Sequence, residues 1–221
     1  MKKSIQKNII YDIKETEKIL FQYKLIEDIR GVSCDDYSVK TINSPYFDKK
    51  YTNNALYWEK NIDNYTFKLV DKSIIYFRFD IKSNDIVKAN INYISGIFLE
   101  KDYNEIIHTI SDDEIEDVLD YERNDFEDFL IKRYLEKKRL SDNVIENILK
   151  LNRNITTIRL DIDIEAAREN HPEIHLTLNN IKNSRFKVDK KYLVSDFICF
   201  ILDIIYGIKI NGRKGFISLK E

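Results

Sequence analysis

The order of hydrophobic and polar residues predicts a mixture of helices and strands. Apolar residues recur at helical spacing over residues 5–29, and Gly31 follows as a stop signal. Residues 32–54 are polar and rich in turn-forming types, so we expect an irregular connection there. A short strand is expected at residues 57–59.

Alternation of apolar and polar residues predicts most of the sheet. Residues 74–81 and 87–93 alternate on either side of a polar Ser-Asn-Asp turn, which is typical of a β-hairpin. The same pattern returns at 158–164 and 174–178, and a shorter run follows at 185–188. These runs predict a mostly antiparallel sheet of about five strands.

Two further segments predict helices. Residues 112–139 are acidic at first and basic at the end, an order that suits the helix macrodipole, and Ser141 can cap another helix that runs to residue 150. Residues 193–206 read as a C-terminal core helix. Its buried face is expected to carry Phe197, Phe200, Ile201 and Ile204.

Length and composition favour an α+β fold in which residues 1–221 form one domain, with the helical segment 112–150 inside it. The net charge of −2 provides no global attraction to nucleic acid or to anionic membranes, although a local basic strip would suffice. Cys199 lies in an apolar run, far from Cys34, which favours a buried thiol and a reducing cytosol. We expect a cytoplasmic protein, because no secretory leader or membrane span is recognised.

The polar side of the second alternating pair carries the candidate functional residues. Side chains two apart on a strand point to one face, so Arg159, Asp161 and Asp163 form a row. If the two strands pair antiparallel over one core, the polar residues of the second strand must share that face. Those residues are Glu173, His175 and Thr177, with His171 of the same parity and Arg185 on a third strand.

This set of side chains fits two kinds of chemistry. A divalent metal, with open positions for water or phosphate, can be held by Asp161, Asp163, His171 and His175. Without a metal, a histidine beside a carboxylate can act as a general acid or base while Arg159 or Arg185 neutralises a phosphate. A solvated sheet face with ordinary cross-strand ion pairs is the alternative that the pattern leaves open.

Common catalytic signatures do not account for these residues. His171 and His175 are four apart, but the helical zinc-protease motif needs Glu directly after the first His, where this chain has Pro172. The sequence contains no phosphate-binding glycine loop, dinucleotide fingerprint or nucleophile elbow, and its 5 glycines leave little room for one.

Four motifs together resemble a known family. They are Arg-x-Asp-x-Asp at 159–163, His-Pro-x-x-His-Leu-Thr-Leu at 171–178, an arginine-bearing strand at Arg185, and Phe-x-x-Phe-Ile-Leu…Tyr at 197–206. This arrangement resembles the uncharacterised bacterial family DUF2290. Asn179 and Lys187 stand where that family usually has glycine and proline, changes that concern turns more than the polar row. The resemblance implies a shared fold and a shared polar site, and it names no reaction.

Three functions follow from these observations. The first is a nuclease-like enzyme acting on phosphodiesters, in a defence or toxin system as the resemblance suggests, with Asp161, Asp163, His175, Arg159 and Arg185 as catalytic residues. The second is a non-catalytic accessory subunit that binds a protein partner through the charged segment 112–139. The third is nucleic-acid binding without chemistry. It would use the basic residues Lys182, Arg185, Lys187, Lys190, Lys191, Arg213 and Lys214. The only cofactor indicated is a divalent metal, and the oligomeric state stays open.

Overall fold

The computed structural model describes residues 4–42, 63–111, 114–115, 122–151, 156–165, 167, 173–178, 185–188 and 193–210. The predicted strand at 57–59 and the metal candidate His171 lie outside these residues. So do five members of the predicted basic strip: Lys182, Lys190, Lys191, Arg213 and Lys214. None of the described helices is long and apolar enough to cross a membrane.

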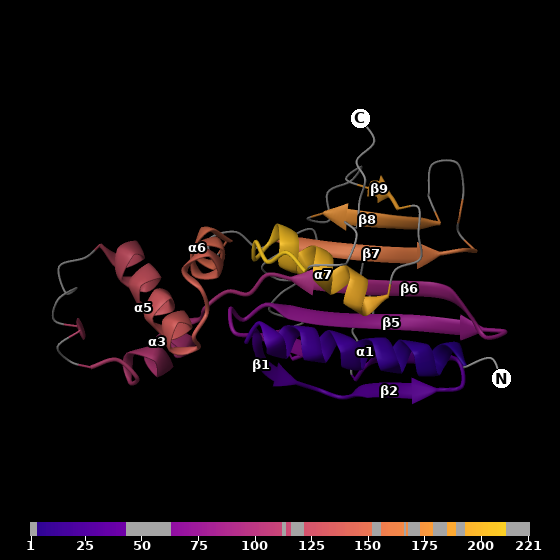
Figure 1. Ribbon diagram of the computed structural model, residues 1–221, viewed down its shortest axis with the longest axis horizontal. Helices are drawn as coiled ribbons and strands as arrows, with labels where there is room; N and C mark the ends of the chain where they lie inside the picture. The colour runs from indigo at the N-terminus through magenta and orange to yellow at the C-terminus, as the bar shows by residue number, and fades with distance from the viewer. Residues whose placement is uncertain are drawn as a thin grey trace.

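An antiparallel sheet occupies the centre of the protein (Figure 1). Within the described residues it contains nine strands rather than the five expected, and the α+β class is confirmed. Its main order is β1 (Ile26–Ile29), β4 (Phe67–Leu69), β5 (Ile74–Lys82), β6 (Asp85–Ile94), β7 (Thr157–Asp163), β8 (Ile174–Leu178) and β9 (Arg185–Lys187). Beside β4, the same edge of β5 pairs with β3 (Ser38–Thr41), which pairs in turn with β2 (Val32–Asp35).

The N-terminal prediction was wrong in two places. Helix α1 (Ile5–Gln22) ends earlier than expected because Lys24 adopts a positive φ of 58°, after which the chain continues as β1. The stretch predicted to be irregular contains β2 and β3. Asp35 shapes the turn between them, since its carboxylate accepts hydrogen bonds from the Tyr37 amide at 2.9 Å and the Ser38 hydroxyl at 2.8 Å.

Helices α1 and α7 (Val194–Ile204) pack side by side over one face of the sheet (Figure 1). The Asp12 carboxylate of α1 accepts a hydrogen bond from the Ser195 amide at 3.0 Å and so caps the start of α7. The core helix is confirmed, but its buried face is rotated from the predicted one: Ile204 is 48% exposed, while Ile198 is buried. Cys199 is partly exposed, contrary to expectation.

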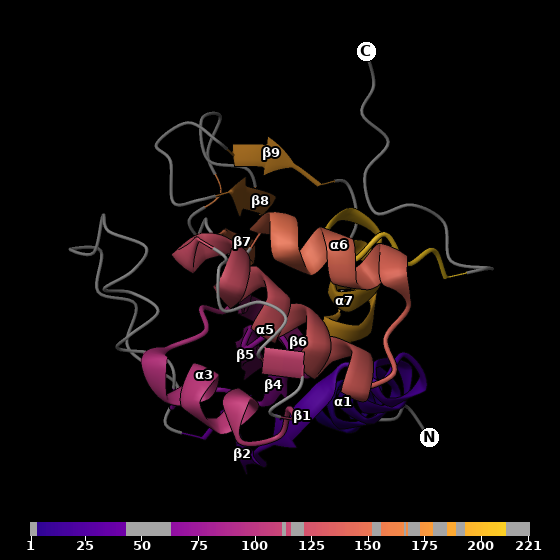
Figure 2. The ribbon, with the colours of Figure 1, turned by 90° about the vertical axis from the view of Figure 1, so that its left-hand side faces the viewer.

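Three described helices lie beyond one end of the sheet (Figures 1 and 2). They are α3 (Glu100–Ile107), α5 (Arg123–Lys137) and α6 (Asp142–Leu151), and we refer to them as the helical lobe. Helices α5 and α6 confirm the helical segment predicted within 112–150, and the Ser141 carbonyl accepts two amide hydrogen bonds in the first turn of α6. The sequence pattern did not predict α3.

Candidate functional site

The strand register aligns polar side chains in rows on the sheet face opposite α1 and α7, which we call the polar face. Asp161 on β7 lies between Asn90 on β6 and His175 on β8. One row along, Arg159 lies opposite Thr177. The parity predicted from the alternation is therefore confirmed for these two strands.

Asp161 is the centre of a polar network on this face. Its Oδ1 accepts a hydrogen bond from Asn90 Nδ2 at 2.6 Å. Its Oδ2 accepts one from Arg159 Nε at 2.6 Å, and His175 Nε2 lies 3.3 Å from the same oxygen. We call Asn90, Arg159, Asp161 and His175 the Asp161 cluster. Asn92 extends it by donating a hydrogen bond to the Asn90 side-chain oxygen.

The side chains of the Asp161 cluster are largely buried. The alternative interpretation of the polar row, a solvated sheet face, predicts exposed side chains instead. The side chain of His175 is 2% exposed, that of Asp161 16% and that of Arg159 20%. Burial by itself would raise the pKa of Asp161, but the hydrogen bond from His175 and the charge of Arg159 hold it below its usual value. Asp161 is therefore an ionised carboxylate at neutral pH.

An internal comparison shows how an ordinary ion pair looks on the same face. On β5, Arg78 Nε lies 2.9 Å from Asp80 Oδ1, in the same two-residue spacing as Arg159 and Asp161. These side chains are 45% and 30% exposed. Burial and the contact with an imidazole thus distinguish Asp161 from Asp80.

The remaining site candidates take different places. Asp163 shares the polar face, with its carboxylate 3.4 Å from Lys88 Nζ. Arg185 lies opposite Thr177 in the register, at the end of the Arg159 row. Among the described residues, no three His, Cys, Asp or Glu side chains are grouped as metal ligands. With His171 outside those residues, the metal set stays a prediction.

Sequence reasoning missed the contribution of β6. Asn90 and Asn92 belong to the first predicted hairpin, and their alternation with Ala89 and Ile91 had already indicated a polar side. What the pattern did not indicate was that β6 pairs with β7 and so brings Asn90 beside Asp161. Pairing between strands about 70 residues apart in the chain is a tertiary feature.

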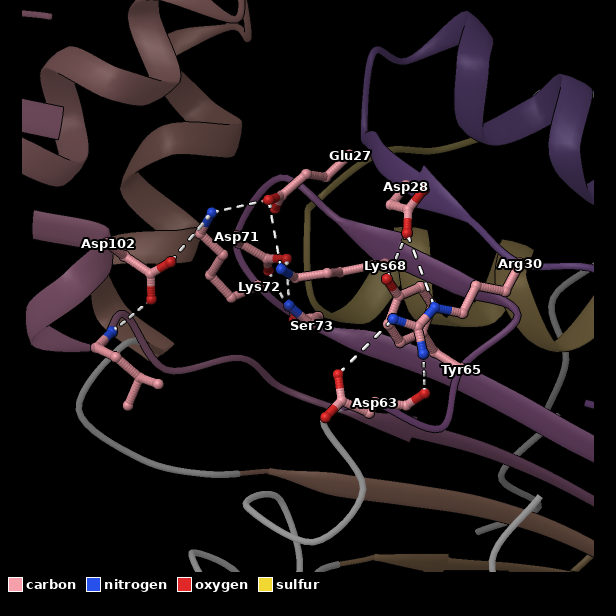
Figure 3. A network of polar contacts seen from close by, with 11 residues as sticks. Glu27, Asp28, Arg30, Asp63, Tyr65, Lys68, Asp71, Lys72, Ser73 and Asp102 are labelled. Carbon is pink, nitrogen blue, oxygen red and sulfur yellow. Dashed lines mark hydrogen bonds and ion pairs between the residues drawn. The ribbon is translucent and has the colours of Figure 1, made fainter. Parts of the chain in front are cut away.

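A second polar network joins the sheet to the helical lobe (Figure 3). Lys72, between β4 and β5, places its Nζ 2.9 Å from Glu27 Oε1 of β1 and 3.5 Å from Asp102 Oδ1 of α3. The neighbouring Asp71 is buried and accepts hydrogen bonds from the Tyr206 hydroxyl at 2.8 Å and the Ser73 hydroxyl at 2.9 Å. Because these groups bind one another across several elements, we assign this network a structural role.

Fold and site together define an α+β protein with an antiparallel sheet, two helices on one face and a buried carboxylate–imidazole–guanidinium cluster on the other. The chain belongs to the family described as "Uncharacterized conserved protein (DUF2290)", whose model matches residues 31–216. That match confirms the resemblance seen in the sequence and spans the whole Asp161 cluster. No curated protein and no solved structure matches the chain.

Proposed function

We propose that the Asp161 cluster is a metal-independent active site that hydrolyses phosphodiester bonds, as a nuclease does. The observation that supports this most directly is that His175 and Arg159 both contact the Asp161 carboxylate where these side chains are largely buried. A buried ion pair adds little net stability, since desolvation offsets most of the attraction. Ionisable groups gathered and buried in this way are instead typical of functional sites.

Each side chain has a role in this proposal. His175 accepts the proton of a water molecule as its oxygen attacks phosphorus, and the same proton later goes to the departing alcohol as the ester P–O bond breaks. Asp161 is a positioning residue that orients the imidazole. Arg159 neutralises the phosphate oxygens, and Arg185, at the end of the same row, is the second candidate for that task.

The contacts of Asp161 favour chemistry without a metal. Both carboxylate oxygens already accept hydrogen bonds, from Asn90 and Arg159. A divalent cation at Asp161 would have to displace these donors and approach a guanidinium that lies 2.6 Å from the carboxylate. Asp163, the other predicted carboxylate ligand, has Lys88 as a neighbour at 3.4 Å. The positive side chains suit an anionic substrate better than a cation.

The proposal is tested by cleavage assays in EDTA with bis(4-nitrophenyl) phosphate and with labelled single-stranded RNA and DNA. The His175→Ala variant should reduce kcat by about 10²–10⁴-fold. Asp161→Asn should reduce kcat, because the imidazole loses the carboxylate that orients it. The matched control is Asp80→Asn, which removes a carboxylate from the same face and the same kind of arginine pair. It should leave the rate unchanged.

Folding must be verified for each variant by far-UV circular dichroism and thermal unfolding, because His175 is buried. Two results would refute the proposal. One is the absence of cleavage of all three substrates by the folded wild-type protein. The other is a folded His175→Ala variant that cleaves at the wild-type rate. Either would leave the cluster as a structural network.

A further inference from the structure

A pocket of about 550 Å³ opens in the helical lobe, which lies beyond the end of the sheet (Figures 1 and 2). Its walls are helices α3 and α5 and residues 97–99, the segment that leads from β6 into α3. The volume lies within the range of roughly 300–1,000 Å³ that is usual for binding sites. The hydrolysis proposed for the Asp161 cluster makes no use of this pocket.

The lining of the pocket is apolar at its base. Phe98 and Leu130 are buried, and Tyr103, Ile107 and Phe126 line it as partly exposed side chains. Apolar side chains that remain partly exposed around a concave surface gain free energy when another apolar group covers them. The base of the pocket therefore suits an aliphatic or aromatic side chain.

The rim of the pocket is acidic. Three carboxylates, those of Glu100, Glu127 and Asp128, stand against one guanidinium, that of Arg123. Arg123 Nε lies 3.0 Å from Glu127 Oε1, so its positive charge is already compensated within the rim. The formal charges of the lining residues therefore sum to a negative value, which attracts cationic groups and repels nucleic acid and anionic lipid.

The second polar network holds the pocket in shape from behind. Lys72 Nζ lies 5.7 Å from the centre of the Phe98 ring and 5.2 Å from that of Tyr134 on α5. The Phe98 ring also packs edge-on against Tyr134, with their centroids 6.0 Å apart. A base fixed in this way reduces the ordering cost of binding, so the pocket is preorganised.

From the apolar base and acidic rim together, we propose that the pocket binds a short segment of a partner protein that presents an apolar side chain flanked by lysine or arginine. The apolar residue fills the base between α3 and α5, and the flanking cations pair with carboxylates such as Glu100. This interaction surface is independent of the proposed hydrolysis, and either can fail without the other.

The test uses an array of seven-residue peptides with Leu or Phe at the centre and Lys, Ser or Glu on both sides. Binding is followed by amide chemical shifts of the full-length, isotope-labelled protein. Lysine-flanked peptides should shift signals of α3 and α5 and leave those of β7 and β8 in place. Glutamate-flanked peptides should not bind, because their charge matches that of the rim.

Three variants make the test specific. Glu100→Lys, on the exposed rim, should lower the affinity for the lysine-flanked peptide by about tenfold or more. Arg123→Glu makes the rim more acidic and should raise the affinity for the same peptide. The matched control is Glu105→Lys, an identical charge change at an exposed position of α3 outside the pocket lining, which should leave the affinity unchanged.

Several results would overturn the proposal. One is the absence of shifts in α3 and α5 with every peptide of the array. Another is glutamate-flanked peptides that bind as tightly as lysine-flanked ones. A third is a Glu100→Lys variant that affects binding no more than Glu105→Lys does. None of these results depends on cleavage activity, so the two proposals can be judged separately.

Discussion

Replacing Lys72 with methionine should destabilise the protein far more than the same change at Lys68. Both amines pair with Glu27 Oε1, Lys72 at 2.9 Å and Lys68 at 3.4 Å (Figure 3). The side chain of Lys72 is 7% exposed and that of Lys68 is 21% exposed. Methionine preserves most of the aliphatic part of the lysine side chain. The backbone at position 72 has a positive φ of 67°, which disfavours lysine and methionine equally. The comparison thus isolates the buried charge.

The expected loss of stability follows from the buried carboxylates that remain after Lys72 is replaced. Without Lys72, the buried Asp102 carboxylate loses its cationic partner, and Glu27 Oε2 already has no hydrogen-bond partner among the described residues. Removing one member of a buried charge cluster costs about 3–5 kcal/mol. Removing Lys68, the more exposed partner, should cost about 1 kcal/mol or less. The larger loss is a substantial part of a total stability of roughly 5–15 kcal/mol.

Urea denaturation monitored by circular dichroism measures both losses. Burial by itself would lower the pKa of Lys72, but Glu27, Tyr134 and Asp102 raise it above its ordinary value of 10.5. A lysine whose pKa is raised in the folded state contributes its full stabilisation at any pH below its unfolded-state pKa. That stabilisation is lost only as the pH rises through the folded-state pKa. The loss of unfolding free energy caused by Lys72→Met should therefore be constant between about pH 6 and pH 9. Equal losses in the two variants would refute this account of the network.

Two further predictions concern the core and the proposed site. An added Cβ at Gly96 would lie 2.1 Å from the carbonyl carbon of Lys72, so Gly96→Ala should lower the free energy of unfolding by about 2 kcal/mol or more. Gly31→Ala, with its nearest atom at 3.5 Å, should change it by less than about 1 kcal/mol, and similar thermal unfolding of the two variants would contradict the clash. Calorimetric titration of metal-stripped protein with Mn²⁺ and Zn²⁺ should show no stoichiometric binding. Binding that is lost in both Asp161→Asn and His175→Ala would overturn the metal-independent proposal and support the predicted metal set.

Alternation proved sufficient to predict the central strands and the polar face. In β7, Ile158, Leu160 and Ile162 are all buried, and the residues between them point to the other side, as a period of two requires. Because side chains alternate between the two faces of a strand, the aliphatic residues alone placed Asp161 and His175 on the same face, whereas their direct pairing is seen only in the strand register. This is the part of the site that sequence could predict.

The edges of the sheet could not be predicted in the same way. Strand β4 has three residues and β1 has four, too few for a period to emerge. The helical spacing at the end of α1 continued through Leu25 and Ile26, which are apolar because they contribute to the core from a turn and a strand. The burial of His175 was equally invisible, since it depends on how much of the polar face other segments cover.

The two arginine–aspartate pairs on the polar face provide the strongest argument that the Asp161 cluster is more than a solvated surface. Arg78–Asp80 and Arg159–Asp161 have the same spacing on strands of one sheet, and both guanidiniums contact the carboxylate through Nε. If the polar face served only solubility, both pairs should be similarly exposed and similarly partnered. Instead, the pair on β7 is more buried and holds an imidazole at 3.3 Å. That difference between otherwise equivalent pairs is the reason to compare Asp161→Asn with Asp80→Asn. Loss of cleavage in the first variant alone would show that burial and the histidine make Asp161 functional, whereas equal effects of the two variants would refute a distinct role for Asp161.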